Sequence, residues 1–349
     1  MLSHRVVLVA RERHQLAPLQ DELGWDFECT WAGAGSRFDV ALFPFARVDW
    51  DPECPRVVWI HDTACFGPLA SAKPDAERER MRMAAQVADR VVVPSEFSRR
   101  ELVSALELPL GKAEVLAPGV DPIFTPPGHD PRLRSEFLEE STGGIPYILF
   151  VGSTEPRKNL CGLLDAFTWL SGQIPHRLVL VCRRPRLSLT QRLIGRACPV
   201  IDRVRALGNR VVFLEEVEPE RLVRLYQYCD LFVMPSLHES FGLPLLEAMA
   251  CAAPCCAART SALSEVGGTA VRWFNAEEPV EMAQGILEGL GQAETLRELG
   301  PTQAAQFDWE RAAHRMLKLL ERECAPASNG QAAPKTNGSA FSRRLSTAG

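Results

Sequence analysis

Two glutamates, Glu239 and Glu247, flank a short segment whose residue types favour a tight turn into a helix. The segment follows the apolar run Leu231–Met234, which is typical of a buried strand. Gly242 then allows close backbone approach, and Pro244 has the fixed φ that suits a first helical position. A strand, a glycine turn and a helix start leave amide N–H groups free beside the positive end of a helix dipole. The sequence therefore predicts an anion-binding turn with a carboxylate on either side.

Two cations, Arg157 and Lys158, form a second candidate anion site. They follow a strand predicted at Tyr147–Val151 and precede Asn159, a good N-cap for the amphipathic helix predicted at Leu160–Leu170. Positive charges beside a helix N-terminus oppose the dipole by about 0.3–1 kcal/mol each. An anion bound between them would reverse the sign of this effect, so we predict that the pair holds one.

His61 and Asp62 come directly after the apolar run Arg56–Ile60, at the carboxyl end of a predicted strand. Ligands of open α/β sheets bind at this edge. We therefore predict that His61 faces a ligand.

Short apolar runs alternate with helical segments along most of the chain, which calls for parallel sheets with helices on both faces. The proline- and glycine-rich segment 118–131 predicts a linker. It separates a first domain at 1–125 from a second at 140–308, and a last helix follows at 309–324. Residues 325–349 are rich in Ser, Gly, Ala and Asn, so we expect a disordered tail.

Helical periodicity and capping residues give the predicted helices of the rest of the chain. These are Ala76–Ala88, Glu96–Leu106 with Ser95 as its N-cap, a stretch near Leu189–Leu207, Pro219–Tyr228, Glu278–Leu290, Ala293–Phe307 and Trp309–Glu323. The segment Ser261–Gly268 is predicted as a turn.

The composition is that of a globular protein large enough for two cores, with 349 residues, 46% hydrophobic and 24% charged. A formal net charge of −5 argues against a general nucleic-acid binder. No apolar run is long enough to span a bilayer. The eleven cysteines lie mainly in apolar segments, so we expect reduced thiols and a cytoplasmic protein.

Three features together resemble the retaining glycosyltransferases of the GT-B fold, in glycosyltransferase family 4 and its mannosyltransferases. These features are the Glu-x7-Glu spacing around Phe241–Gly242, the segment from Gly152 to Arg157–Lys158, and His61–Asp62. The resemblance implies an α/β fold of two Rossmann-like domains that face a central cleft. The first would lie on the acceptor side, the second would bind a nucleotide sugar, and the last helix would cross back onto the first.

The resemblance also assigns roles to individual residues. It implies catalytic roles for Glu239, His61, Lys158 and Arg157, and donor-binding roles for Gly152, Ser153, Arg157, Lys158, Phe241, Gly242, Leu243 and Glu247. Glu239 would lie beside the transferred sugar, whereas Glu247 would bind the ribose hydroxyls. The diphosphate would meet the backbone around Gly242 and the two cations. Many members carry an arginine where this chain has Ser153. In this chain the side chains that bind the diphosphate would therefore be those of Arg157 and Lys158.

The implied reaction transfers a hexose from a nucleotide diphosphate sugar to a glycan, lipid-linked or small-molecule acceptor. GDP-mannose is the first choice of donor from the resemblance, and UDP- and dTDP-hexoses stay open. We expect no cofactor, and no metal because no Asp-x-Asp motif stands in a fitting loop. The resemblance also leaves open that the protein associates peripherally with the inner face of the membrane.

Two other functions fit the same residues. One is a sugar-nucleotide epimerase of the GT-B fold, which would act without an acceptor. The other is a non-catalytic subunit that binds nucleotide sugar and partners another transferase.

Overall fold

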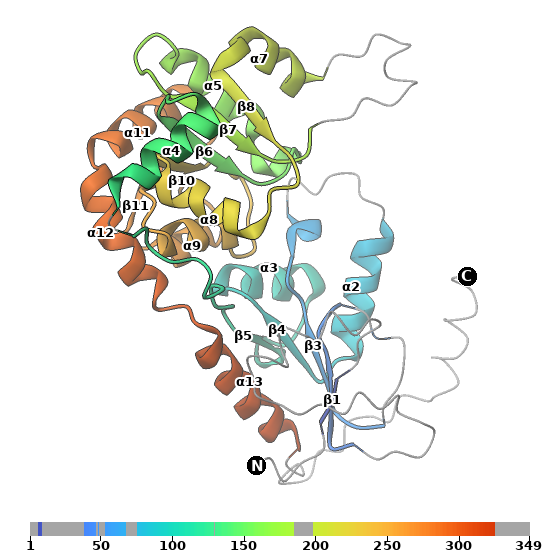
Figure 1. Cartoon of the computed structure of the whole chain (residues 1–349). Helices are drawn as coiled ribbons and strands as arrows, with labels where there is room; N and C mark the ends of the chain where they lie inside the picture. The colour runs from blue at the N-terminus through green and yellow to red at the C-terminus, as the bar shows by residue number, and fades with distance from the viewer. Residues whose placement is uncertain are drawn as a thin grey trace.

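A computed structural model describes residues 6–8, 38–46, 48, 53–67, 75–128, 130–184 and 198–324. Two parallel β-sheets, each with its own helices, form a first and a second domain (Figure 1). The predicted tail at 325–349 lies outside the described residues.

The first domain is built on a five-stranded sheet in which neighbouring strands follow one another in the chain. In sheet order the strands are β1 (Val6–Leu8), β2 (Val40–Phe43), β3 (Arg56–Trp59), β4 (Arg90–Val93) and β5 (Ala113–Val115), all parallel. Its helices include η2 (Ala64–Phe66), α2 (Asp75–Val87), α3 (Glu96–Leu106) and η3 (Leu110–Lys112).

The two faces of this sheet are covered by different parts of the chain. Ala41 and Phe43 of β2 pack on one face with residues of α2 and α3. Val40 and Leu42, whose side chains point to the opposite face, pack with α13 (Trp309–Cys324). The last helix therefore crosses back onto the first domain, as predicted.

The second domain has a six-stranded parallel sheet in which the chain changes direction once. Its order is β11 (Val271–Phe274), β10 (Cys255–Ala258), β9 (Leu231–Met234), β6 (Tyr147–Val151), β7 (Arg177–Val181) and β8 (Val211–Leu214). The chain runs from β6 outward to β8, then returns to β9 and runs outward the other way. The boundary between β6 and β9 is thus the switch point of the sheet, where open α/β folds bind ligands.

Eight α-helices and two short 3-10 helices belong to the described part of this domain. They are α4 (Pro131–Thr142), η4 (Pro156–Lys158), α5 (Leu160–Leu170), α7 (Pro199–Leu207), η5 (Gly208–Arg210), α8 (Pro219–Tyr228), α9 (Leu243–Ala250), α10 (Leu263–Gly267), α11 (Pro279–Gly291) and α12 (Ala293–Ala304). The core between them and the sheet is continuous, and the central strand β9 is buried along its whole length.

Most predicted helices are confirmed, and three segments differ. Pro131, taken as the end of a linker, is the first residue of α4, whose N-cap is Asp130. The predicted turn Ser261–Gly268 contains the short helix α10. Of the stretch near Leu189–Leu207, α7 covers the end and 185–197 lies outside the described residues.

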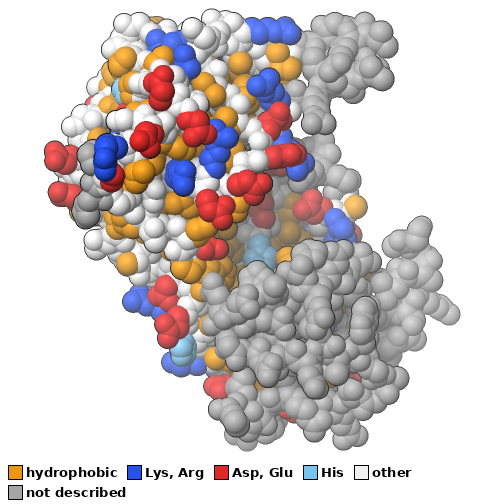
Figure 2. All heavy atoms as spheres, viewed as in Figure 1, with side chains coloured by type: hydrophobic (Ala, Val, Ile, Leu, Met, Phe, Trp, Pro, Cys, Tyr) orange, Lys and Arg blue, Asp and Glu red, His pale blue; other side chains and the backbone are white. Residues whose placement is uncertain are grey.

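Acidic and basic side chains are interspersed on the face of the second domain in Figure 2, and the surface is hollowed where the domains meet. This pattern fits the small net negative charge.

Within the described ranges no helix has the length and apolar character needed to cross a membrane. The cysteines of the same ranges are free thiols, as expected.

Candidate active site

Two loops meet at the carboxyl end of the second sheet, on the two sides of its switch point. The cation loop, residues 152–158, follows β6, and the carboxylate loop, residues 235–242, follows β9. The amide of Leu237 donates to the carbonyl of Arg157 over 2.7 Å, which ties the loops together. The predicted cations and the first predicted glutamate are thus held side by side.

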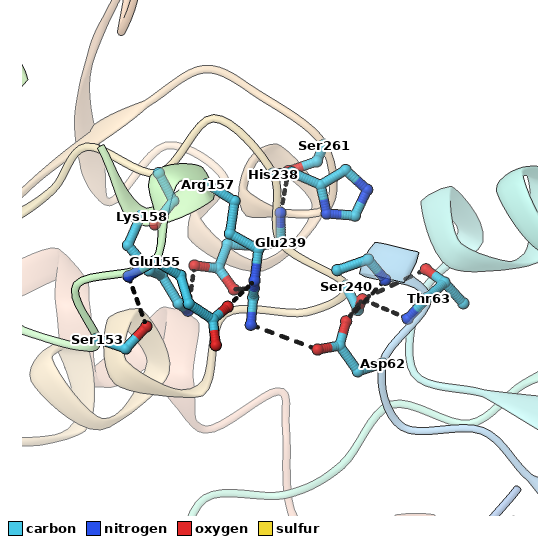
Figure 3. A network of polar contacts seen from close by, with 12 residues as sticks. Asp62, Thr63, Ser153, Glu155, Arg157, Lys158, His238, Glu239, Ser240 and Ser261 are labelled. Atoms are coloured by element: carbon cyan, nitrogen blue, oxygen red, sulfur yellow. Dashed lines mark hydrogen bonds and ion pairs between the residues drawn. The ribbon is translucent and has the colours of Figure 1, made fainter. Parts of the chain in front are cut away.

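Glu239 is the buried centre of this site, with 5% of its surface exposed. Lys158 Nζ lies 2.6 Å from one carboxylate oxygen, and Arg157 Nη1 lies 3.5 Å from the other (Figure 3). The amide of Glu239 donates to Ser261 Oγ over 2.9 Å, which fixes the backbone of the loop. A buried carboxylate destabilises the fold unless it is paired, and these contacts supply the pairing.

Arg157 is held by carboxylates from three parts of the chain. Besides Glu239, its Nε contacts Glu155 at 2.8 Å and its Nη2 contacts Asp62 at 3.4 Å. Burial opposes the charge of the guanidinium, but Asp62 and Glu239 outweigh it and raise the pKa of Arg157. The guanidinium is therefore charged and fixed in direction.

Asp62 brings the first domain into the site, a contact that the sequence did not predict. Its carboxylate accepts hydrogen bonds from Ser240 Oγ at 2.7 Å and from the amide of Ala64 at 2.9 Å. Burial alone would raise the pKa of Asp62, but the bond from Ser240, the Ala64 amide and the two cations lower it. The side chain is therefore an anion at neutral pH.

The turn after Glu239 has the backbone shape that the sequence predicted. Gly242 has φ +106°, in the left-handed region that favours glycine, and a Cβ there would also require the Leu263 side chain, 2.5 Å away, to shift. Gly242 is also the N-cap of α9 and offers no side-chain cap. Pro244 is the second rather than the first helical residue, after Leu243. Pro244 has no amide N–H, and the amide of Leu245 donates to the carbonyl of Gly242 over 3.0 Å, so the amide of Leu243 is the one that the first turn of α9 leaves for an anion.

The other predicted donor-binding residues shape the two loops rather than contact Glu239. Phe241 is buried against Phe307, with ring centroids 5.7 Å apart. The amide of Gly152 donates to β7, and Ser153 Oγ accepts from the amide of Glu155 at 3.4 Å. Asn159 is the N-cap of α5, as predicted, and accepts from the amide of Gly162. Roles for Gly152, Ser153 and Phe241 in ligand binding stay predictions.

Glu247 lies one turn inside α9 and has its own partner. Tyr226 donates its hydroxyl to Glu247 Oε2 over 2.9 Å from the neighbouring helix α8. Desolvation raises the pKa of Glu247; the bond from Tyr226 lowers it, and the charge of Asp121 adds to the rise. The carboxylate is separate in its contacts from the group around Glu239, which suits a different role.

We expect Glu247→Gln to stabilise the ligand-free protein at neutral pH. A carboxyl whose pKa is raised by folding contributes stability below its ordinary value of 4.5, and this is lost as the pH rises through the folded value. The advantage of glutamine should therefore be present at about pH 7.5 and vanish at about pH 4. Urea unfolding at both values tests this, with the exposed Glu281→Gln as control. An equal effect at both pH values would contradict it.

His61 is predicted to face a ligand, and the contacts that its side chain makes are with residues of its own domain. Its Nε2 lies 2.7 Å from the carbonyl oxygen of Pro44, and its ring stacks on Trp59 with centroids 4.8 Å apart. Desolvation lowers its pKa, an effect that the bond to Pro44 opposes. These partners belong to the first domain, and it is the adjacent Asp62 that contacts Arg157. A catalytic role for His61 stays a prediction.

The site as described combines three carboxylates, Asp62, Glu155 and Glu239, with the two cations Arg157 and Lys158. No group of three or more His, Cys, Asp or Glu side chains in the described ranges has the arrangement of a metal site. Chemically, such a site can bind a phosphate-bearing ligand and stabilise both developing negative and developing positive charge.

The comparison with known families agrees with the fold. The family of group 1 glycosyl transferases matches residues 145–292, which contain both loops. The D-inositol 3-phosphate glycosyltransferase of Mycolicibacterium smegmatis is 30% identical over 318 residues, which cover 86% of this chain and 69% of that protein. The chain belongs to the group 1 glycosyltransferase family, of the GT-B fold and the family-4 type.

Other similar proteins differ more in length or sequence. The serotype-specific mannosyltransferase WbdA of Escherichia coli is 30% identical over 179 residues, which cover 50% of this chain and only 22% of WbdA. The solved structure of HepE from Anabaena in complex with UDP and glucose superposes with a TM-score of 0.64 at 20% identity, over 81% of this chain and 78% of HepE. That likeness shows the GT-B fold.

Proposed function

We propose that this protein is a glycosyltransferase that moves a hexose from a nucleotide diphosphate sugar to an acceptor, with retention of configuration and without a metal ion. The observation that carries the proposal is the contact of Glu239 with Lys158 at 2.6 Å and Arg157 at 3.5 Å, beside the uncapped start of α9. Membership of the family supports the same reaction class.

The two cations and the amide of Leu243 at the start of α9 suit the diphosphate. As the bond from the sugar to the diphosphate breaks, negative charge grows on the leaving phosphate. Arg157 and Lys158, already in place, stabilise that charge without reorganising. This does the work that a metal ion does in other phosphate chemistry.

Glu239 suits the sugar. The ring becomes positively charged as the leaving group departs, and a buried carboxylate a short distance away stabilises that charge. Lys158 lies between the positions proposed for the sugar and for the diphosphate, because it contacts Glu239 and belongs to the cation loop. We assign Glu239 an electrostatic and orienting role.

The nucleoside end of the donor suits Glu247. A carboxylate there can accept hydrogen bonds from the two ribose hydroxyls, while Tyr226 orients it. Such contacts exist equally in the ground and transition states, so their loss would raise the donor KM more than it lowers kcat.

The donor is proposed to be GDP-mannose, supported by the likeness to a mannosyltransferase. UDP- and dTDP-hexoses are the other candidates, and HepE, which was solved with UDP and glucose, shares the fold. The acceptor is proposed to be a glycan, a lipid-linked sugar or a small molecule. If it is lipid-linked, the protein would act in the cytoplasm at the inner face of the membrane.

A thermal-shift panel of nucleotides and sugar nucleotides tests the donor site. A ligand at 100 times its Kd adds about 2.7 kcal/mol of stability, so the true donor should stand out clearly. Release of nucleoside diphosphate is then followed with and without candidate acceptors. Acceptor-dependent release supports the transferase; release without any acceptor would favour the epimerase, and binding without turnover would favour the non-catalytic subunit.

A further inference from the structure

The two domains meet through a buried group of polar side chains that the mechanism above does not use. We call this group the junction. It consists of Thr63, Ser95, Ser98 and Glu101 of the first domain with His238 and Ser240 of the second. Figure 3 shows Thr63, His238 and Ser240 beside the cation loop. Because hydrogen bonds fix distance and direction, such a group can set the position of one domain against the other.

Ser240 is the centre of the junction, with 4% of its surface exposed. Its hydroxyl accepts from the amide of Thr63 over 2.9 Å and donates to Asp62 Oδ1 over 2.7 Å. Its carbonyl oxygen accepts from Ser95 Oγ at 2.6 Å and from Ser98 Oγ at 2.9 Å. One residue of the carboxylate loop therefore binds four residues of the first domain.

Glu101 makes a second bridge from the first domain. Its carboxylate accepts from Thr63 Oγ1 at 2.6 Å and from His238 Nε2 at 2.8 Å. The ring of His238 lies so close to Gly67 that a Cβ there would be 2.8 Å away. The loop that follows His61 is therefore held by Glu101 through Thr63, and it lies against His238 at Gly67.

Glu265 of the second domain holds the helix that carries these groups. Its carboxylate accepts from the amides of Glu96 and Phe97 at 2.8 Å each, at the start of α3. Negative charge at a helix N-terminus is favourable. The helix bearing Ser98 and Glu101 is therefore fixed to the second domain at its first turn.

Asp62 connects the junction to the site around Glu239. Its carboxylate touches Ser240 on one side and Arg157 on the other. We propose that Ser240, with the junction around it, is a positioning residue that holds the His61–Thr63 loop over Arg157, Lys158 and Glu239 during transfer. The catalytic part of this inference rests on the proposed function.

Kinetics of Ser240→Ala test the positioning role, with Ser236→Ala as the matched control. Ser236 is fully buried in the same loop, and its hydroxyl has no hydrogen-bond partner among the described residues. The free energy of a hydrogen bond to a charged group corresponds to a factor of about ten or more in a rate constant. We therefore expect kcat of Ser240→Ala to fall by that factor. Donor KM should stay within about twofold, because the proposed donor contacts lie in the second domain. Ser236→Ala should keep both values.

A double-variant cycle with Asp62→Asn shows whether Ser240 acts through Asp62. If it does, the two losses of kcat do not multiply: the double variant should be within about twofold of the slower single variant. Multiplying losses, or a Ser240→Ala enzyme that behaves like Ser236→Ala, would overturn the proposal.

Hydrogen exchange gives a readout that needs no turnover. The amide of Thr63 loses its acceptor in Ser240→Ala, so exchange in peptides covering residues 57–67 should be about tenfold faster than in wild type or Ser236→Ala. Equal exchange in the three proteins would refute the junction even if transfer is observed. Faster exchange in a protein without any transfer would refute the proposed function and leave the junction standing.

Discussion

Glu239→Gln should lower kcat by about a hundredfold or more while nucleoside diphosphate binds as tightly as to the wild type. Glutamine keeps the size of the side chain and an oxygen that can accept from Lys158, now at 2.6 Å from the carboxylate. What it removes is the negative charge that would stabilise the positive sugar ring. Steady-state kinetics with the identified donor, together with calorimetric titration of the nucleoside diphosphate, measure both effects.

Glu155→Gln is the matched control for this variant. Glu155 contacts the same arginine at 2.8 Å, yet 38% of its side chain is exposed, against 6% for Glu239. Solvent screens the charge of an exposed carboxylate, so we expect no more than about a threefold change in kcat. If Glu239→Gln lost only donor affinity, or if both variants were near wild type, the role assigned to Glu239 would be wrong.

The local features of the site could be predicted from the sequence because short-range chemistry determines them. The apolar run before Glu239 forms the buried strand β9, and Gly242 has the positive φ that its turn requires. Asn159 caps α5, and Ser95 caps α3 through the amide of Ser98. Each depends on residues a few positions apart, where residue type limits the backbone.

The partners of the site residues could not be predicted in the same way. Ser240 and Asp62 are separated by 178 positions, and the hydrogen bond between them exists only once two sheets have packed together. Tyr226 reaches Glu247 from another helix. Neither contact leaves a periodicity or a spacing in the sequence, so tertiary structure was needed to find them.

The missed elements have local causes. Pro131 closes a proline-rich stretch that resembles a linker, but a proline is also favourable in the first turn of a helix, and Asp130 caps α4. The strand β11, Val271–Phe274, contains arginine and tryptophan, and only its first and last residues are buried. An edge strand of this kind has a weak apolar pattern.

Lys158→Met should affect both ligand binding and folding, because Lys158 is the closest partner of a buried carboxylate. A charge-assisted hydrogen bond to phosphate is worth about 1.5–3 kcal/mol, so the Kd of the nucleoside diphosphate should rise about tenfold or more. Binding of the nucleoside, which lacks the phosphates, should hardly change. The free energy of unfolding should fall by about 3 kcal/mol, since Glu239 is left charged and buried with Arg157 as a more distant partner. Calorimetric titration and urea unfolding measure the two effects.

The double variant Lys158→Met with Glu239→Gln separates these two effects. Replacing both members of a buried ion pair by neutral residues removes the unpaired charge, so most of the lost stability should return. The affinity for nucleoside diphosphate should not return, because the cation that binds the phosphate is still absent. Lys318→Met, an exposed lysine on α13, is the control for the substitution itself and should leave stability and affinity near wild type. A Lys158→Met protein that binds nucleoside diphosphate like the wild type would show that the lysine serves only to neutralise Glu239. The anion site would then rest on Arg157 and the start of α9 alone.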